Sequence, residues 1–368
     1  MKTMKSKFYS LALAAGMLTL TACSDDNTND SNNDKGNGIE NGSTLKGTIT
    51  EDVTLKAGNT YKLSGEYIVE AGATLNIEEG VKIISVYDNI VDYILVKQGA
   101  KINAVGTPDK PIVMTSEKEE PGAWGGIHIC GKAHTNAEGG KGSSEIGGAV
   151  YGGNDDADNS GTLQYIRLEY TGFAFDEEHE ANGISFYGVG NGTIVDHCEA
   201  YKGSDDGFEF FGGSVNVSNM VVVSCSDDSF DWTEGWNGKG TDLVAYQEAK
   251  ATLGYDCDCL IEADNNENDN AATPVSHPVL KNLILAGNGE SKQGIRLRRG
   301  TQADIDNAKV CGKGQPLVVE SALTNAALKN GTSRLTNMTV TAALKSDGDY
   351  TNDDFTAVTS NKVDATLS

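Results

Sequence analysis

Short apolar runs separated by glycine, asparagine and aspartate dominate the chain from residue 45 onward. Examples are the ranges 74–77 (Thr-Leu-Asn-Ile), 81–84 (Val-Lys-Ile-Ile) and 93–96 (Tyr-Ile-Leu-Val). Before the last third of the chain, no long stretch shows the 3.6-residue apolar period of an amphipathic helix. The pattern therefore predicts many short β-strands joined by turns.

Some of these strands recur at a fixed spacing. The segment 204–210 (Ser-Asp-Asp-Gly-Phe-Glu-Phe) returns 22 residues later as 226–232 (Ser-Asp-Asp-Ser-Phe-Asp-Trp). The segment 182–187 lies on the same frame one period earlier, and less regular copies follow at 260–264 and 294–298. Such a period, with three short strands per turn and coils stacked about 4.8 Å apart, is typical of a parallel β-helix.

We therefore expect an all-β fold, a right-handed parallel β-helix (solenoid), over residues 45–320. A β-sandwich is the alternative, but its hairpins would not repeat at one spacing. Residues 321–329 have a short amphipathic helical pattern, and the chain from 347 to 368 is polar. Residues 321–368 are therefore predicted to form a short helical or irregular C-terminal cap and a loosely attached polar tail.

The charge balance excludes one class of partner. The 368 residues include 53 Asp and Glu against 29 Lys and Arg, a formal net charge of −24. Binding to phosphate backbones requires clustered cationic side chains, so we expect no nucleic-acid partner. The hydrophobic share of 38% is below the ~45–50% of ordinary domains. A narrow coil interior and a flexible polar segment both account for it.

The first 22 residues predict an export signal. Three lysines precede an apolar run that is shorter than the ~20 residues of a membrane-spanning helix. The sequence Leu-Thr-Ala-Cys that ends at Cys23 resembles the lipobox of bacterial lipoproteins, in which the signal is cut before the cysteine. This resemblance implies that Cys23 is lipidated and that outer-membrane lipid is a partner.

Residues 23–44 are predicted to be a lipid-anchored, disordered tether. Ser24-Asp25-Asp26 resembles the acidic export tag of surface lipoproteins of Bacteroidota, which implies a location on the outer membrane facing the cell exterior. The rest of the segment is nearly all Asn, Asp, Gly, Ser and Thr. Such a composition buries too little apolar surface to become ordered.

Several segments resemble a family of secreted β-helix lipoproteins of Bacteroidota. They are the ranges 72–81, 106–113 and 124–127 and the two Ser-Asp-Asp-x-Phe coils. The similarity covers residues 45–320 and implies the fold and the surface location. It implies no reaction, so the function is argued from the residues.

Acidic residues recur with the coils. In a stack, Glu209, Asp231 and Glu262 would form one column, with Arg296 or Arg298 one coil further on. Like charges about 4.8 Å apart repel by about 3.5 kcal/mol at an effective dielectric constant of 20. A sheltered column would therefore need raised pKa values, a bound cation or a neighbouring arginine. A column open to water would simply be a solvated face with Asp turns.

The predicted ligand-binding face combines these acids with aromatic residues. Its residues are Asp205, Asp206, Glu209, Asp227, Asp228, Asp231, Trp232 and Trp236. Exposed aromatic rings would give sugars a platform for stacking. Packing in the core is the other interpretation of the aromatic residues.

Catalysis on the same face is a second possibility. The aspartate pairs and Arg296 superficially resemble the sites of β-helix polysaccharide lyases and hydrolases, and the candidate catalytic residues are Glu209, Asp231 and Arg296. Glycoside hydrolysis needs two carboxylates at a defined separation, which stacked coils can provide. The Gly-His-Gly and Arg-Ile-Lys motifs of polygalacturonases are missing, however. We therefore expect binding rather than catalysis.

A calcium site is predicted at a separate loop. Asp156, Asp158 and Ser160, followed by Gly161, match the first half of an EF-hand loop. The twelfth position is Arg167 instead of Glu, so a loop built on an Asx turn is an equal alternative. The only cofactor we expect is Ca²⁺, with a structural role if it binds here.

Six cysteines follow Cys23, and export permits disulfides between them. They are Cys130, Cys198, Cys225, Cys257, Cys259 and Cys311. No pairing follows from their spacing, and buried thiols inside the coil are the favoured expectation.

Three functions remain in view. The leading hypothesis is a non-catalytic surface lipoprotein whose face at residues 182–300 binds glycan or another extracellular ligand. The second is a calcium-dependent polysaccharide lyase or glycoside hydrolase. The third is a structural envelope component, which predicts buried aromatic residues and Asp turns satisfied by backbone amides. The sequence specifies no oligomeric state.

Overall fold

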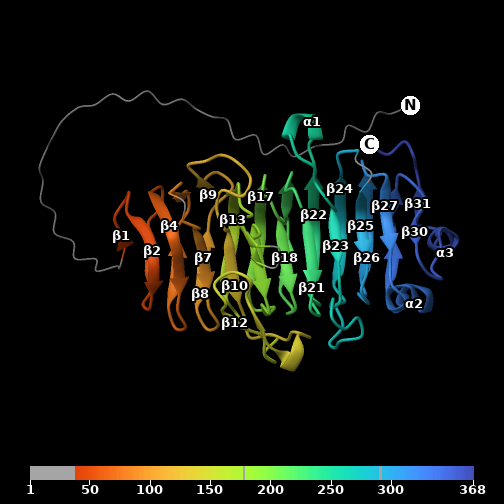
Figure 1. Ribbon diagram of the computed structural model, residues 1–368, viewed down its shortest axis with the longest axis horizontal. Helices are drawn as coiled ribbons and strands as arrows, with labels where there is room; N and C mark the ends of the chain where they lie inside the picture. The colour runs from red at the N-terminus through yellow and green to blue at the C-terminus, as the bar shows by residue number, and fades with distance from the viewer. Residues whose placement is uncertain (1–37, 89, 177–178, 290–291) are drawn as a thin grey trace, which may run out of the picture. The chain divides into compact units, whose positions relative to one another are not determined.

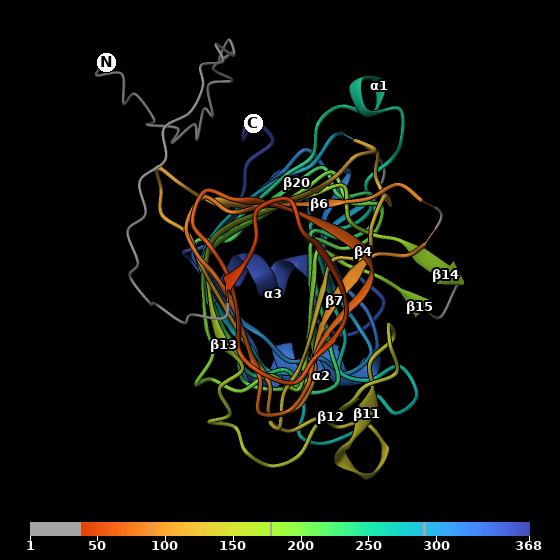
Figure 2. The same cartoon turned by 90° about the vertical axis from the view of Figure 1, so that its left-hand side faces the viewer.

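The computed structural model describes residues 38–88, 90–176, 179–289 and 292–368. These residues wind into a stack of coils around one narrow interior (Figures 1 and 2). Among the described residues, 27 strands form one sheet in which neighbouring coils pair in parallel throughout. The fold is therefore the expected parallel β-helix. The predicted signal peptide, Cys23 and most of the tether lie outside the described residues.

Three faces make up each coil. The first face contains β7 (Tyr93–Val96), β10 (Ile127–Cys130), β16 (Ile184–Tyr187), β18 (Phe208–Phe211), β21 (Phe230–Thr233), β23 (Ile261–Ala263), β25 (Gln293–Leu297), β27 (Gln315–Val319) and β30 (Lys345–Ser346). The second contains β1 (Gly38–Ile39), β3 (Val53–Leu55), β5 (Thr74–Ile77), β8 (Lys101–Val105), β19 (Asn216–Ser218) and β28 (Arg334–Thr336). The third contains β6 (Lys82–Ser85), β9 (Ile112–Ser116), β20 (Val221–Val223), β29 (Thr339–Val340) and β31 (Lys362–Val363).

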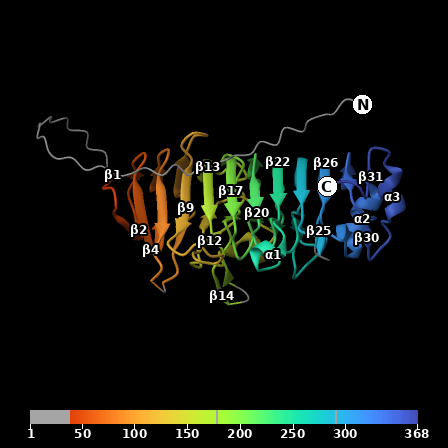
Figure 3. The ribbon, with the colours of Figure 1, turned by 90° about the horizontal axis from the view of Figure 1, so that it is seen from above.

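Longer strands bend from one face to the next. They are β2 (Thr44–Ile49), β4 (Thr60–Val69), β13 (Gly161–Glu169), β17 (Ile194–Tyr201), β22 (Lys239–Tyr246), β24 (Val279–Ala286) and β26 (Asp304–Cys311). Seen from above, several of them lie side by side along the stack (Figure 3).

The bend between the second and third faces falls on one residue per coil. Asn219, Asp242, Asn282, Asn307 and Asn337 hold this place with φ values of 53° to 61°. Asn tolerates the left-handed region better than most residues. Its amide also links the coils: Asn307 Nδ2 donates to Asn282 Oδ1 at 2.9 Å, and Asn282 Nδ2 donates to Asp242 Oδ1 at 2.9 Å. The asparagines therefore adopt the backbone conformation of the bend and also join neighbouring coils by hydrogen bonds.

The 22-residue period holds on only part of the coil. Val195 pairs with Val217 and Phe208 with Phe230, both 22 residues apart. Between β16 and β18 of the first face, however, Ile184 pairs with Phe208, so the expected alignment of 182–187 was wrong by two residues. Turns absorb insertions at little cost, whereas a strand that slipped by one residue would turn its apolar side chains outward.

Alternate strand residues fill the interior. Phe186 stacks on Phe210 with ring centroids 5.1 Å apart, and Phe210 stacks on Trp236 at 4.1 Å. Phe208 and Phe230 stack likewise in the neighbouring position. Aromatic contacts of this kind add to the free energy of burying the rings.

Two hairpins project outside the coils (Figure 2). One belongs to the excursion 131–160 between β10 and β13, which contains a short 3₁₀ helix (Glu138–Gly140) and pairs β11 (Gly142–Ser143) with β12 (Val150–Tyr151). The other pairs β14 (Ala174–Asp176) with β15 (His179–Glu180). A short helix, α1 (Lys250–Leu253), lies in a third excursion.

The C-terminal segment closes the stack. Helix α2 (Ala322–Asn330) is capped by Ser321, and α3 (Asn352–Ala357) begins with a capping box of Thr351 and Asp354. Parallel pairing continues through β30 and β31, and Phe355 is fully buried. The short helical end is as expected, but this apolar anchoring contradicts a loosely attached tail. No helix in the described residues is long and apolar enough to cross a membrane.

Candidate functional site

One outward row of the first face carries the predicted column. Ser185, Glu209, Asp231, Glu262 and Arg296 occupy paired positions on β16, β18, β21, β23 and β25. Their neighbours along each strand point into the core, because side chains alternate across a strand.

The column opens into a cavity of about 260 Å³. Ten of its twelve lining residues are acidic and one is cationic; the lining consists of Glu145, Glu180, Asn182, Asp205, Asp206, Glu209, Asp227, Asp228, Asp231, Asp258, Glu262 and Arg296. We call this cavity the acidic cleft. It contains every acidic residue of the predicted ligand-binding face and all three candidate catalytic residues.

Two walls of the acidic cleft were not expected. Glu145 comes from the excursion 131–160 and Glu180 from β15. Neither residue lies on the repeating frame, so the period could not reveal them. Asn182 lies two residues before β16 and Asp258 three residues before β23, and these positions before each strand were the available signal.

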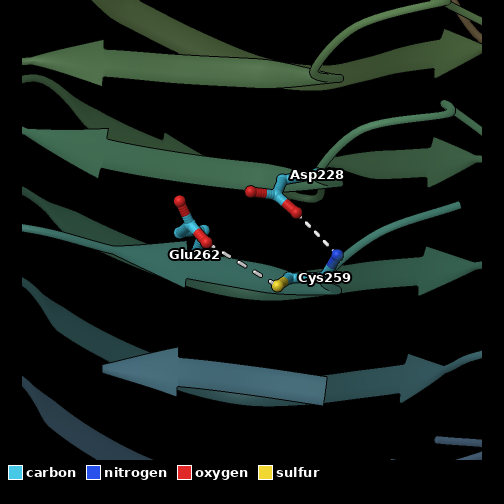
Figure 4. A group of neighbouring side chains, drawn as sticks. All are labelled: Asp228, Cys259 and Glu262. Atoms are coloured by element: carbon cyan, nitrogen blue, oxygen red, sulfur yellow. Dashed lines mark hydrogen bonds between the residues drawn. The ribbon is translucent and has the colours of Figure 1, made fainter. Parts of the chain in front are cut away.

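A ladder of hydrogen bonds runs through the turns before these strands. The side-chain oxygen of Asn182 accepts from the Asp206 N–H at 3.2 Å, and Asp206 Oδ1 accepts from the Asp228 N–H at 2.8 Å. Asp228 Oδ1 in turn accepts from the Cys259 N–H at 2.6 Å (Figure 4). These contacts are what the structural hypothesis predicts for the Asp turns, so Asp206 and Asp228 support the stack in addition to lining the cleft.

Other carboxylates of the cleft keep unused acceptors. Asp205 is 6% exposed, and neither its Oδ2 nor Asp231 Oδ1 has a hydrogen-bond partner among the described residues. Glu209 Oε2 accepts from Asn182 Nδ2 at 2.6 Å. A buried acceptor without a donor costs free energy, so these oxygens point to a proton, a cation or a ligand.

Burial and crowding disfavour ionisation in the cleft. Burial raises the pKa of Asp205 to about 8, with the charges of Glu180 and Asp227 adding to the effect. Burial, reinforced by neighbouring carboxylates, raises the pKa values of four further residues well above their usual range: Asp206, Glu209, Asp228 and Asp231. The column of Glu209 and Asp231 is therefore sheltered from water and is not an open, solvated face.

The single arginine of the cleft is already paired. Arg296 Nη1 lies 3.0 Å from Glu262 Oε1, and its Nη2 lies 3.1 Å from Glu320 Oε2. Arg298, just outside the lining, bonds Glu262 and Asp264. Arg296 thus closes one end of the cleft as an ion-pair partner.

Three groups in the described part of the chain place possible metal ligands within 4.8 Å of one another. Two offer oxygens alone: Asp205/Asp206/Asp227 and Asp206/Glu209/Asp231. The third, Asp228/Cys259/Glu262, includes a thiol that lies 3.9 Å from Glu262 Oε1 (Figure 4). The oxygen groups suit a hard cation such as Ca²⁺.

The side chains of the predicted calcium loop bond other groups of the protein. Asp156 Oδ1 lies 2.6 Å from His134 Nδ1, whereas Asp158 Oδ2 accepts from the Lys132 N–H and from Ser160 Oγ. The Ala157 N–H donates to Asp155 Oδ1, which is an Asx turn. The Asx turn of the alternative interpretation is thus present, and the calcium site at this loop stays a prediction.

The two tryptophans belong to the core. Trp232 and Trp236 are each 1% exposed. Trp232 Nε1 donates to Thr301 Oγ1 at 3.0 Å, and Trp236 Nε1 donates to the Val215 carbonyl at 3.2 Å. The expected sugar-stacking platform was wrong, because these rings fill the interior behind the acidic column. The six cysteines of the described region are free thiols, five of them buried.

Comparison with known families defines the class of protein. Residues 47–367 match the family described as "Pectate-lyase like beta helix domain", so the chain belongs to this family. Domains of this kind often bind or act on polysaccharides.

A solved structure is similar at a greater distance. The mannuronan C-5 epimerase AlgE6 A-module of Azotobacter vinelandii shares 13% sequence identity with this chain, at a TM-score of 0.32. The alignment covers 80% of this chain and 79% of that one. The similarity is too distant to transfer an activity. The comparison with curated proteins returned no match.

Proposed function

We propose that this protein is a surface lipoprotein whose acidic cleft binds a glycan without cleaving it. The observation that carries the proposal is the cleft itself, in which ten acidic residues converge while buried oxygens of Asp205 and Asp231 lack partners. Carboxylate oxygens accept hydrogen bonds from sugar hydroxyls, and a concave site with convergent polar groups is the usual form of a small-ligand site.

A bound cation would strengthen the binding of a glycan in the cleft. Asp206, Glu209 and Asp231 fit Ca²⁺, because each offers a carboxylate oxygen within 4.8 Å of the others. When bound, Ca²⁺ would supply positive charge and coordination positions for sugar hydroxyls. The carboxylates themselves would orient the sugar and exclude other anions.

Binding is favoured over elimination chemistry by the state of Arg296. A lyase needs a base beside the sugar, and the cleft's one cationic residue is held by Glu262 and Glu320. An arginine in two ion pairs stays protonated and is a poor base.

Glycoside hydrolysis is the second candidate, on one specific observation. The pKa of Asp205 is raised to about 8, so this carboxyl keeps a proton at neutral pH, as a general acid must. Another cleft carboxylate would then serve as base or nucleophile. The released reducing ends would distinguish this activity from binding.

The proposed location rests on the resemblances at the N-terminus. Lipidation at Cys23 would anchor the chain in the outer membrane, with the residues between Cys23 and the first coil holding the coils outside the cell. Cys23→Ser should move the protein from the membrane fraction to the soluble fraction. Protease added to whole cells should digest the wild-type protein if it faces outward.

A glycan array with and without Ca²⁺ tests the binding function. We expect a glycan that binds wild-type protein and is lost in Asp231→Asn, with Asp109→Asn as a matched control at an exposed turn. The bound glycan should show no new reducing ends after incubation. If no glycan binds under either condition, the structural interpretation is left, which the ladder and the buried tryptophans already support.

A further inference from the structure

The acidic cleft has the wrong charge to bind an acidic polysaccharide, which would need cationic side chains. Ten acidic residues and Arg296 line about 260 Å³, while Lys292 and Arg298 pair with the lining residues Asp258 and Glu262. The ionised carboxyls would repel an anionic sugar, and the carboxyls that burial keeps protonated would ionise more readily beside a positive charge. The ligand with matching charge is one that carries a cation of its own.

We propose that the glycan bound by the acidic cleft contains an amino sugar with a free, protonated amine, held by Asp205, Asp206 and Asp227. This proposal rests on the glycan-binding function and names its ligand class. The amine is the recognised group, and the remaining sugar hydroxyls bond the neighbouring carboxylates.

The geometry of the three aspartates suits an ammonium group. A primary ammonium has three N–H donors, and acceptors about 2.8 Å from its nitrogen in a tetrahedral arrangement lie about 4.6 Å apart. Asp205, Asp206 and Asp227 each place a carboxylate oxygen within 4.8 Å of the other two. One ammonium can therefore donate to all three residues.

Asp205 supplies an independent observation. Its side chain is 6% exposed and lines the cleft, yet its Oδ2 has no donor among the described residues. A buried carboxylate oxygen without a donor is destabilising in the empty protein. A ligand N–H at this oxygen removes that penalty.

The same contact already exists at the edge of the cleft. Lys292 Nζ lies 2.8 Å from Asp258 Oδ2, and Asp258 is a lining residue. A protein ammonium thus pairs with one carboxylate of the cleft. Lys292 also acts on the charge of Asp227, but no described hydrogen bond or ion pair joins a lysine to Asp205, Asp206 or Asp227.

The volume restricts how much ligand enters. A cavity of about 260 Å³ is just below the range of ~300–1,000 Å³ typical of small-molecule pockets. It admits one sugar unit, and the rest of the chain must lie outside. A Ca²⁺ ion on Asp206, Glu209 and Asp231 would share Asp206 with the amine and stand beside it.

Calorimetric titration of the purified protein with three tetrasaccharides tests the proposal. The ligands are the β-1,4-glucosamine tetramer, its fully N-acetylated form and a galacturonate tetramer, at pH 6 and 0.15 M salt, with either chelator or Ca²⁺ present. We expect the glucosamine tetramer to bind at least tenfold more tightly than the acetylated one, because acetylation removes the charge and two donors. The galacturonate tetramer should bind most weakly in chelator.

Two variants locate the interaction. Asp205→Asn should weaken glucosamine binding at least tenfold, and Asp205→Asn with Asp227→Asn should weaken it further. The control is Glu40→Gln with Glu51→Gln, which removes two charges from exposed positions in the first coils and should leave the Kd unchanged. Thermal melting of every variant verifies that it is folded.

The possible results distinguish a failure of the amino-sugar proposal from a failure of glycan binding. Equal binding of the amine and acetylated tetramers overturns the amino-sugar ligand and leaves glycan binding intact. An equal loss in the Glu40/Glu51 control shows general charge attraction and also overturns it. Complete competition by Ca²⁺, lost in Asp205→Asn, shows that the three aspartates are a metal site instead. Absence of binding to any glycan removes the proposed function itself.

Discussion

Asp231 and Trp232 are consecutive residues of β21 whose side chains lie on opposite sides of the coil wall. Asp231 lines the acidic cleft with Oδ1 unpartnered, whereas Trp232 is 1% exposed and bonds Thr301 in the interior. Ligand binding and stability are thus separated onto adjacent positions of one strand.

Trp232→Ala should lower the free energy of unfolding by about 3–5 kcal/mol, because it leaves a large cavity in the interior. The folded fraction should bind glycan with unchanged affinity. Urea unfolding and titration at low temperature would measure both quantities. A loss of affinity in fully folded protein would contradict the placement of this ring in the core.

Asp205→Asn should stabilise the ligand-free protein. The substitution removes a buried carboxyl that faces the charges of Glu180 and Asp227 and has an unpartnered oxygen. We expect a gain of about 1–3 kcal/mol, the usual size of a single-site effect, seen as a higher urea midpoint at pH 8. Asp347→Asn serves as a contrast, since Asp347 accepts hydrogen bonds from Ser321 and Asn325 at the cap and its loss should destabilise. A lower midpoint in Asp205→Asn would show that the carboxyl is stabilising.

Stability should fall as the pH rises from about 6.5 to about 8 in the presence of chelator. The pKa of Asp205 is raised from 3.8 to about 8, so between these values the folded state holds a proton that the unfolded chain has lost, and folding weakens with rising pH. Buried His128 opposes this trend, because its pKa is lowered from 6.5 to about 4, but only below pH 6.5. Urea midpoints across this range would measure the slope.

The slope should be smaller in Asp205→Asn, which no longer takes up that proton. Carboxyls with lowered pKa, such as Asp354 at about 2, act in the opposite direction and lose their contribution only below about pH 4. A midpoint that rises between pH 6.5 and pH 8 in chelator would contradict the crowding of protonated acids in the cleft.

Ca²⁺ should raise the melting temperature more at pH 8 than at pH 5, since protonated carboxyls are poor ligands. At 100 times its Kd, the ion would add about 2.7 kcal/mol by mass action. Glu209→Gln should remove most of the gain, because it takes one of the three oxygens of the Asp206/Glu209/Asp231 group. Asp156→Asn should keep the gain, because Asp156 lies outside this group and contacts His134.

Asn282→Ala should destabilise the protein by about 1–2 kcal/mol, because alanine at a φ of 61° is strained and both inter-coil hydrogen bonds disappear. Asn282→Gly should cost less, since glycine adopts this conformation freely. Equal effects of the two substitutions would mean that backbone strain contributes nothing at this bend.

Much of this architecture can be predicted from the chain alone. Short strands at a repeating interval lead to stacked coils, and alternation within 208–210 and 230–232 places Glu209 and Asp231 in one outward row. The same alternation places Phe208, Phe230 and Trp232 inward. Trp232 forms no exposed platform, because alternation along the strand turns it to the side opposite Asp231.

The remaining features depend on contacts that no local pattern encodes. Glu145 and Glu180 reach the cleft from excursions whose packing is decided by the whole stack. The pairing of Arg296 with Glu320 joins residues 24 positions apart on adjacent coils. The contact of Asp156 with His134 joins residues 22 positions apart that no local pattern relates.

The outward residues from Ser185 to Arg296 are evenly spaced along the stack, one per coil. Each coil adds one outward residue and about 4.8 Å, so duplication of a single coil would lengthen the cleft by one step without disturbing the chemistry on either side. The length of cleft available to a ligand would then change by one coil at a time, and related proteins would differ in the number of coils that form the cleft.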